Sequence, residues 1–147
     1  MTATVFVDSN VFIYAFDDAD QTKQASARTW RMELWKRRAG RVSFQVLNEF
    51  YVKVCQKWPA ARLHARAEVR DLLRWHPVGV NAGLLEQAWK IQDRYRLSFW
   101  DAQIVAAARL ASCHYLLTED LQAGQNFDGV IVTNPFRDSP ESLLDQS

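Results

Sequence analysis

Four acidic residues, Asp8, Glu49, Asp101 and Asp120, are the side chains of this 147-residue chain best suited to metal-dependent chemistry. Carboxylates that crowd together repel one another, which raises some of their pKa values and costs free energy unless a cation compensates. Their oxygen atoms suit Mg²⁺ or Mn²⁺ and do not suit zinc. A cation held in this way can activate a water molecule and offset the charge on a phosphodiester. If the four acids meet in the fold, they predict hydrolysis of phosphodiester bonds.

The first acid follows a segment that predicts a buried strand. Residues 4–7 are β-branched or aromatic, the run is too short for most helices, and Asp8 comes directly after it. Asn10 lies near the cap of a short apolar helix expected over 10–16. In open α/β sheets, ligands bind at the carboxyl edge of the strands, because loops and helix N-termini converge there. Asp8 is therefore placed where a ligand site is expected.

Helices and strands alternate along the chain up to about residue 136. Such alternation predicts a three-layer α/β fold with a central, mostly parallel sheet of about five strands. Pro77 and Gly79 weaken one strand candidate and suggest that it lies at an edge. Besides the segments above, the expected helices are 21–38, 45–58, 60–74, 81–96 and 98–112, and the expected strands are 41–44, 75–80, 114–118 and 130–133.

This fold class would bring the acids to one edge of the sheet. Crossover helices run antiparallel to the strands, so helix N-termini lie at the same edge as strand C-termini. Glu49 lies in the first or second turn after the second strand, and Asp101 opens a helix. Asp8 and Asp120 each follow a strand. We therefore expect all four acids to be catalytic.

Three of the four acids also have a purely structural interpretation. Asp8 would serve as the cap of the helix that follows it, and Glu49, taken alone, is typical of a solvated helix surface. Asp101 would interact with the helix dipole, with Ser98 as the cap, although its apolar neighbours argue for a buried partner. Only the four acids together favour the functional interpretation.

Composition is typical of a globular protein. With 48% hydrophobic residues, the chain is long enough for a single domain over residues 1–147, with a core at about 4–136 and a surface tail at 137–147. Cys55 and Cys113 have no C-x-x-C spacing and are expected to be reduced core residues, which favours a cytoplasmic location. No run of about 18 apolar residues and no N-terminal export pattern occurs, so a membrane span is not expected.

Two basic segments are candidates for contact with nucleic acid. The net charge of only +1 requires any polyanion to be held by a local patch or by metal ions. One segment covers residues 36–41, at the end of an amphipathic helix. The other is a stripe of arginines spaced four apart, a pattern more typical of a solvated helix face. The stripe consists of Arg62, Arg66, Arg70 and Arg74.

The sequence around the acids resembles the PIN-domain family, and specifically the VapC-type ribonuclease toxins of bacterial type II toxin–antitoxin systems. The resemblance runs from Val5 to about Phe136 through the segments FVDSNVFIYAF, QVLNEFYV, SFWDAQIVAAA and LLTEDLQAGQNFDGVIVTNPF. It implies a Rossmann-like PIN fold and an endoribonuclease that depends on Mg²⁺ or Mn²⁺. It also implies a homodimer with an RNA substrate, inhibited by a small VapB-like antitoxin.

Carried over by position, the resemblance implies an acidic cluster with two supporting polar residues: Asp8, Glu49, Asp101 and Asp120, with Asn10 and Thr118. Asp8 and Asp101 would contact the metal directly, and Glu49 and Asp120 would bind it directly or through water. Asn10 and Thr118 would orient ligands or phosphate by hydrogen bonds. Glu119 lies beside the motif and is an additional candidate.

Two interpretations from other classes stay open. A haloacid-dehalogenase-like phosphatase also places an Asp after its first strand, but it usually has a second Asp two positions later, where this chain has Asn10. A covalent aspartyl-phosphate would favour that class. A non-catalytic metal-binding interaction module would bind its partner without turnover. Motifs of other enzymes are absent, since the sequence has no H-E-x-x-H, G-x-S-x-G or phosphate-binding loop.

Overall fold

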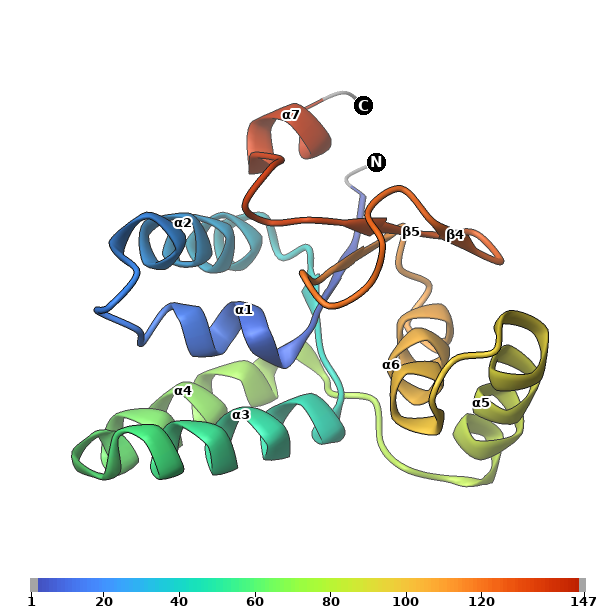
Figure 1. Cartoon of the computed structure of the whole chain (residues 1–147), viewed down its shortest axis with the longest axis horizontal. Coiled ribbons are helices and arrows are strands. Elements are labelled where there is room, and N and C mark those ends of the chain that lie inside the picture. The colour runs from blue at the N-terminus through green and yellow to red at the C-terminus, as the bar shows by residue number, and fades with distance from the viewer. Residues whose placement is uncertain (1–2, 146–147) are drawn as a thin grey trace.

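A five-stranded sheet lies between two groups of helices in the computed structural model, which describes residues 3–145 (Figure 1). The strands are β1 (Val5–Val7), β2 (Gly40–Arg41), β3 (Tyr115–Leu117), β4 (Asn126–Phe127) and β5 (Val130–Thr133). The helices are α1 (Ser9–Tyr14), α2 (Gln21–Arg37), α3 (Phe44–Lys57), α4 (Arg62–Leu72), α5 (Ala82–Tyr95), α6 (Phe99–Leu110) and α7 (Pro140–Leu144).

The strands follow the order β2-β1-β3-β5-β4, and only β4 is antiparallel to its neighbour. Helices α1 to α4 lie on one side of the sheet, and α5 and α6 lie on the other (Figure 1). The prediction of a three-layer α/β fold with a mostly parallel sheet of about five strands is confirmed. No helix among residues 3–145 is long and apolar enough to cross a membrane.

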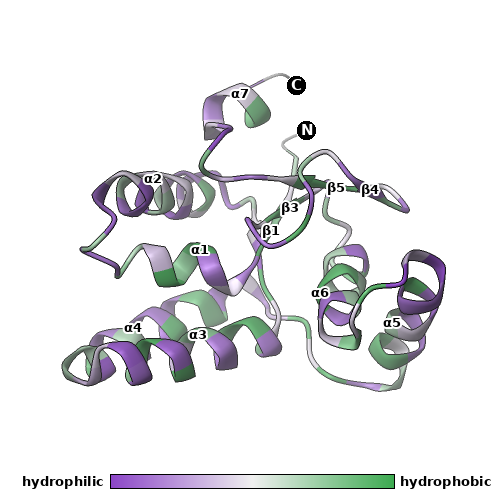
Figure 2. Cartoon of the chain, viewed as in Figure 1, coloured by the Kyte–Doolittle hydropathy of each residue, from purple (hydrophilic) through white to green (hydrophobic). Residues whose placement is uncertain are grey.

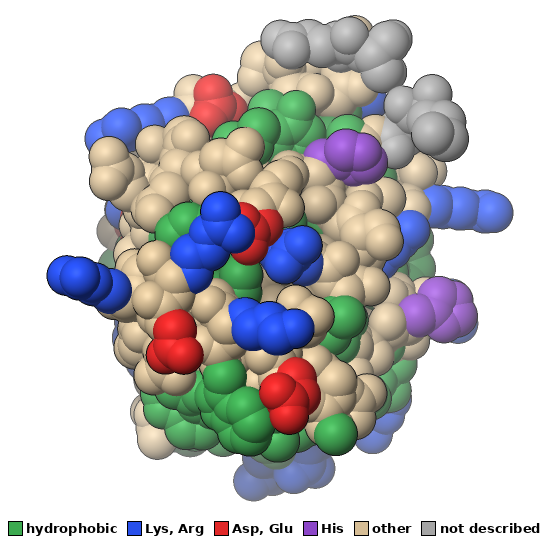
Figure 3. Space-filling view, turned by 90° about the vertical axis from the view of Figure 1, so that its right-hand side faces the viewer, with side chains coloured by type: hydrophobic (Ala, Val, Ile, Leu, Met, Phe, Trp, Pro, Cys, Tyr) green, Lys and Arg blue, Asp and Glu red, His purple; other side chains and the backbone are tan. Residues whose placement is uncertain are grey.

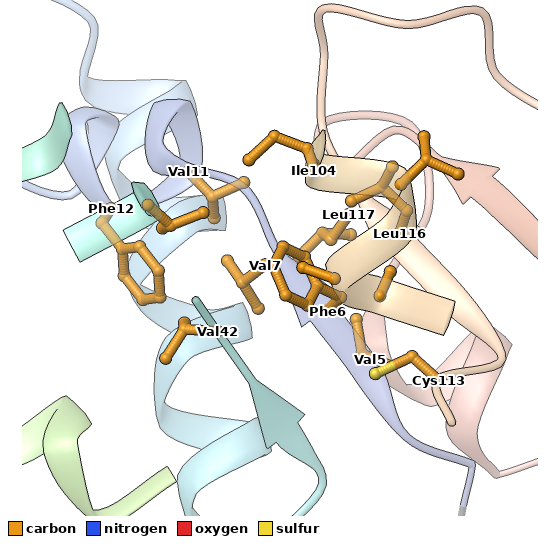
Figure 4. Packing of buried hydrophobic residues seen from close by; sticks show 14 of the residues in the cluster. Val5, Phe6, Val7, Val11, Phe12, Val42, Ile104, Cys113, Leu116 and Leu117 are labelled. Atoms are coloured by element: carbon orange, nitrogen blue, oxygen red, sulfur yellow. The ribbon is translucent and has the colours of Figure 1, made fainter. Parts of the chain in front are cut away.

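The central strand β1 is buried on both of its faces. Val5 and Phe6 are 0% exposed, and successive side chains of a strand point to opposite faces, so both faces must be covered. Figure 4 shows Phe6 and Val7 between Phe12 of α1 and Ile104 of α6. This packing explains why the strand is a continuous apolar run without alternation.

Hydrophobic faces of the helices turn towards the sheet, and polar faces turn outwards (Figure 2). Helix α6 is the exception, because all residues from Ala102 to Ala108 are buried. It contacts α5 on one side and β3 and β5 on another. The expectation that this helix is packed on several sides agrees with the structure. Cys113, which follows it, is buried, whereas Cys55 is only half-buried, and both are free thiols.

The strand expected at 75–80 is wrong. Residues Leu73–Trp75 form a 3₁₀ turn, and His76 has a positive φ of 53°. Pro77 has no N–H to donate to a ladder. Only Val78 pairs with the sheet region, through an isolated parallel bridge to Ser43. The chain passes the sheet edge here without extending it.

The strand β4 was not expected from the sequence. It forms a hairpin with β5 through Asp128 and Gly129, whose φ angles are 51° and 107°. Positive φ at both central positions is typical of the tight hairpin turn that favours Asp-Gly. That dipeptide was the available signal. A two-residue strand is too short to show the alternation by which strands are recognised.

The second strand and the tail also differ from expectation. The strand covers Gly40–Arg41 and not 41–44, because Ser43 caps α3 by accepting a hydrogen bond from the N–H of Val46 at 3.3 Å. Part of the expected surface tail forms α7, whose Leu144 is buried. Residues 146–147 lie outside the described residues.

Candidate active site

The carboxyl edge of β1 and β3 holds the first two site residues. Asp8 directly follows β1, Thr118 directly follows β3, and the two strands are parallel with Val7 paired to Leu117. Asp8 caps α1, because its Oδ1 accepts a hydrogen bond from the N–H of Ser9 at 2.7 Å. The Thr118 hydroxyl donates to Asp8 Oδ2 at 2.9 Å. The strand register therefore holds this carboxylate in one orientation.

Asn10 connects these residues to Asp120. Its Nδ2 lies 3.0 Å from Thr118 Oγ1, 3.1 Å from Asp120 Oδ2 and 3.3 Å from Asp8 Oδ2. The Asp120 N–H donates to Thr118 Oγ1 at 3.1 Å. An amide donor between two carboxylates partly offsets their repulsion. Four sequence-predicted residues thus form one hydrogen-bonded cluster.

Glu49 joins the cluster through residues that were not predicted from the sequence. Ser9 Oγ donates to Glu49 Oε2 at 3.2 Å, and Gln45 Nε2 donates to Glu49 Oε1 at 3.0 Å. The buried Gln103 of α6 donates in turn to Gln45 Oε1 at 2.6 Å. The spacing of Gln45 and Glu49, four residues apart on one helix, was an available signal. The contact with Gln103 joins segments far apart in the chain and had none.

Asp101 lies near this network without joining it. It occupies the first turn of α6, and its N–H donates to the hydroxyl of the cap residue Ser98 at 3.1 Å. Within the described residues, its half-buried carboxylate makes no hydrogen bond or ion pair. Gln45 Nε2 lies 3.4 Å from the carbonyl oxygen of Trp100, which places the start of α6 beside α3. The helix-cap interpretation of Asp101 agrees with this geometry.

The electrostatics of the site centre on Asp8, which is 8% exposed. Burial, with smaller contributions from the charges of Asp120 and Glu49, raises the pKa of its carboxyl from 3.8 to about 6. The hydrogen bonds from Ser9 and Thr118 act in the opposite direction. The increase in the pKa of Asp8 caused by burial and by like charges is therefore larger than the decrease caused by the hydrogen bonds. A cation near Asp8 would relieve this cost.

Glu119 is engaged elsewhere. Its carboxylate accepts a hydrogen bond from Tyr14 and forms an ion pair with Lys23 at 2.8 Å. Lys23 Nζ also lies over the rings of Tyr14 and Phe136, 4.8 and 4.9 Å from their centroids. Burial would raise the pKa of Glu119, but the bonds from Lys23 and Tyr14 outweigh it and lower that pKa. The charge of Glu119 is therefore already compensated by Lys23.

The donor types fit a hard divalent cation, although they do not surround one as they stand. Carboxylate and hydroxyl oxygens of Asp8, Asp120 and Thr118 are the ligands that Mg²⁺ and Mn²⁺ prefer. Among residues 3–145, no group of three His, Cys, Asp or Glu side chains converges closely enough to hold a metal ion. The Asn10 amide lies between two of the acids. Direct binding therefore requires side-chain rotation at the rim, where Asp120 is exposed.

Comparison with known proteins gives the family. The family model described as PIN domain matches residues 5–125. Among solved structures, FitAB bound to a DNA fragment is similar at a TM-score of 0.72 and 16% identity, covering 91% of this chain and 96% of that one. A toxin–antitoxin complex from Klebsiella pneumoniae gives 0.64 and 18%, covering 90% and 98%.

A third similar structure is VapC20 of Mycobacterium tuberculosis, described as a toxin that cleaves the sarcin–ricin loop. Its TM-score is 0.57 at 24% identity, covering 77% of this chain and 87% of that one. A comparison with curated proteins gave no match. At these identities the solved structures show a shared fold alone. The resemblance found in the sequence is confirmed at the family level, because the matched model spans β1 to the segment before β4: the chain belongs to the PIN domain family.

Proposed function

We propose that this chain is the toxin component of a type II toxin–antitoxin system, acting as an endoribonuclease that depends on Mg²⁺ or Mn²⁺. The observation that carries the proposal is the buried Asp8 at the carboxyl edge of the sheet, with a raised pKa and with Asp120 and Glu49 around it. Placement of such a group in a ligand-binding edge is typical of a functional site. Membership of the PIN domain family and the toxins among the similar structures support the same function.

The proposed roles of the acids are those that the family resemblance implies. Asp8 and Asp101 would hold the cation directly, and Glu49 and Asp120 would hold it directly or through water. A bound divalent cation supplies a Lewis acid that offsets charge on the phosphodiester and acidifies a water molecule. Ser9 and Thr118 keep the Asp8 carboxylate in its orientation by their hydrogen bonds.

Asn10 would act as a positioning residue. Its amide contacts Asp8, Asp120 and the Thr118 hydroxyl, so it holds the carboxylates of two different loops at a constant separation. Such partners orient ligating oxygens and maintain their basicity. The amide would also be available to donate to a phosphate oxygen once the acids bind a cation.

The proposed partners come from the similar structures. The Klebsiella pneumoniae structure is a toxin–antitoxin complex, and FitAB is described as bound to DNA. By likeness, we propose that this chain pairs with a small VapB-like antitoxin, forms a homodimer and acts on RNA in the cytoplasm. Co-expression with a candidate VapB-like antitoxin, followed by size-exclusion chromatography with light scattering, would test the complex and its stoichiometry.

The test of the function is cleavage of total cellular RNA by the purified protein with Mg²⁺, with Mn²⁺ and with EDTA. We expect cleavage with either metal, none with EDTA, and none by Asp8→Asn. Asp93→Asn is the matched control, because Asp93 is an exposed acid of α5. Cleavage retained by Asp8→Asn would contradict the proposed site. A covalent aspartyl-phosphate, or metal binding without turnover, would favour one of the two alternative classes.

A further inference from the structure

A basic pocket lies at the opposite end of β2 from the acids. It has a volume of about 490 Å³ and lies where the end of α2 meets the chain after α4. Three arginines and one histidine face it together with two tryptophans, and no acidic residue lines it. The lining residues are Trp35, Arg38, Gly40, Arg41, Arg74, Trp75 and His76.

The arginines of this pocket lack acidic partners. Among residues 3–145, Arg38, Arg41 and Arg74 form no ion pair, whereas Arg31 and Arg37 of α2 each bind two carboxylates. Arg41 is held by its own turn, because its Nη1 donates to the carbonyl oxygens of Gly40 and Arg38 at 2.8 and 3.2 Å. These arginines lie close together without acidic partners among the described residues. Such a concentration of positive charge favours an anionic ligand.

The pocket is built on a close contact between backbone and indole. The ring of Trp75 packs directly on Gly40, where a Cβ would lie only 2.4 Å from the ring. Trp35 lies beside it, with ring centroids 6.4 Å apart and an angle of 37° between the planes. Arg38 and His76 both have positive φ, at 55° and 53°. Both residues end a helical segment, α2 and the 3₁₀ turn Leu73–Trp75, in the left-handed conformation common at helix C-termini.

We propose that this pocket binds the phosphate backbone of the single-stranded RNA that the acidic site cleaves, a proposal that rests on the proposed function. Gly40 pairs with Val5, three residues before Asp8, so the pocket lies roughly 10 Å from the acids along the strand direction. Arginine forks match phosphate oxygens. A net charge of +1 means that a local patch must supply this attraction.

The test measures binding of a fluorescein-labelled single-stranded RNA by anisotropy in EDTA, where no cleavage is expected. The variant is Arg38→Gln/Arg41→Gln/Arg74→Gln, and the matched control is Lys90→Gln/Arg96→Gln/Arg137→Gln, which removes the same charge from exposed basic residues outside both candidate segments. We expect the pocket variant to bind at least tenfold more weakly at 0.1 M salt. The slope of log affinity against log salt should fall by about 2, the value for three lost phosphate contacts on a single strand.

Unchanged RNA binding by the pocket variant, or an equal loss in the control, would overturn the proposal. So would pocket-dependent binding of a polyglutamate peptide with RNA binding unaffected, since the pocket would then serve a protein partner. Circular dichroism checks the fold, and Arg74→Gln alone, at an exposed side chain, replaces the triple variant if that variant unfolds. Cleavage by Asp8→Asn would overturn the proposed function and leave this binding result standing on its own.

Discussion

Asp8 carries the largest electrostatic cost among the residues of the acidic site. Its carboxyl is buried, its pKa is raised to about 6, and two further acids add to the repulsion. In the unfolded chain the same group titrates near its ordinary value of 3.8. The folded protein therefore binds a proton at Asp8 between pH 4 and 6 that the unfolded chain has already lost. Stability must fall as the pH rises through this range.

Asp8→Asn removes this titration and should stabilise the metal-free protein at neutral pH. The difference in unfolding free energy between the variant and the original chain should reach about 3 kcal/mol above pH 6 and shrink below pH 4. Asn keeps one oxygen, which can accept from the N–H of Ser9, and its NH2 can donate to the Thr118 hydroxyl oxygen. Urea unfolding of both proteins in EDTA at several pH values measures this difference in unfolding free energy. A difference that stays constant with pH would contradict the raised pKa, and Asp93→Asn should show no such trend.

Gln45 links α3 to α6 and orients Glu49. Gln45→Ala removes the donor to Glu49 and leaves the amide of the buried Gln103 without its acceptor, so we expect a destabilisation of about 1–3 kcal/mol. Gln45→Ala combined with Gln103→Leu should recover part of that stability, because both polar partners are gone. RNA cleavage should stay reduced in the double variant, since Glu49 still lacks its donor. Full recovery of cleavage would contradict a positioning role.

At the scale of elements, the β4–β5 hairpin connects the sheet to α5 and α6. Asp128 in its turn accepts from the Tyr95 hydroxyl at 2.7 Å and pairs with Arg94 at 2.9 Å and Arg109 at 3.6 Å. Figure 3 shows the side of the molecule that carries α5 and β4, where lysine and arginine side chains gather. Because Arg109 belongs to α6, the hairpin helps to hold the helix that carries the candidate acid Asp101.

Gly129→Ala should destabilise the protein by about 1–2 kcal/mol, because its φ of 107° disfavours any L side chain. Gly79→Ala is the matched control, since Gly79 has open space around the added Cβ and no positive φ. Thermal unfolding of the two variants measures the effect. Equal melting temperatures would show that the hairpin turn does not require glycine.

At the scale of the whole molecule, opposite charges are separated along β2 and β1. The acids lie at the carboxyl edge of the sheet, and the unpaired arginines of the basic pocket lie towards the other end, although the net charge is only +1. A ligand that binds only the folded chain stabilises it by mass action. The acidic edge should therefore respond to divalent cations and the pocket to polyanions.

Mg²⁺ should raise the melting temperature of the original chain at pH 7.5, because ionised Asp8 gains a counter-charge. The rise should continue with concentration above the dissociation constant and be absent in Asp8→Asn. Differential scanning fluorimetry with a matched series of KCl concentrations separates metal binding from ionic strength. An identical rise in Asp8→Asn would place the metal elsewhere.

Much of the acidic site was predictable from local signals. A few neighbouring residues are enough to predict the strand before Asp8 and the strand before Thr118. The same holds for the capped helix that carries Asp101. The rule that the C-termini of parallel strands share one edge brings Asp8 and Thr118 together, whereas Asp101 lies near their network without joining it. This is why the order of elements and the family resemblance could both be recognised from the sequence.

The side-chain contacts between distant segments could be seen only in the tertiary structure. The Gln103–Gln45 bond, the Asn10 amide between Asp8 and Asp120, and the pairing of Glu119 with Lys23 all join different elements. The contact between Trp75 and Gly40 of β2 in the basic pocket likewise joins segments far apart in the chain. Local sequence determined which backbone each segment prefers, whereas packing and strand register determined which side chains meet, because those choices minimise the free energy of the whole chain at once.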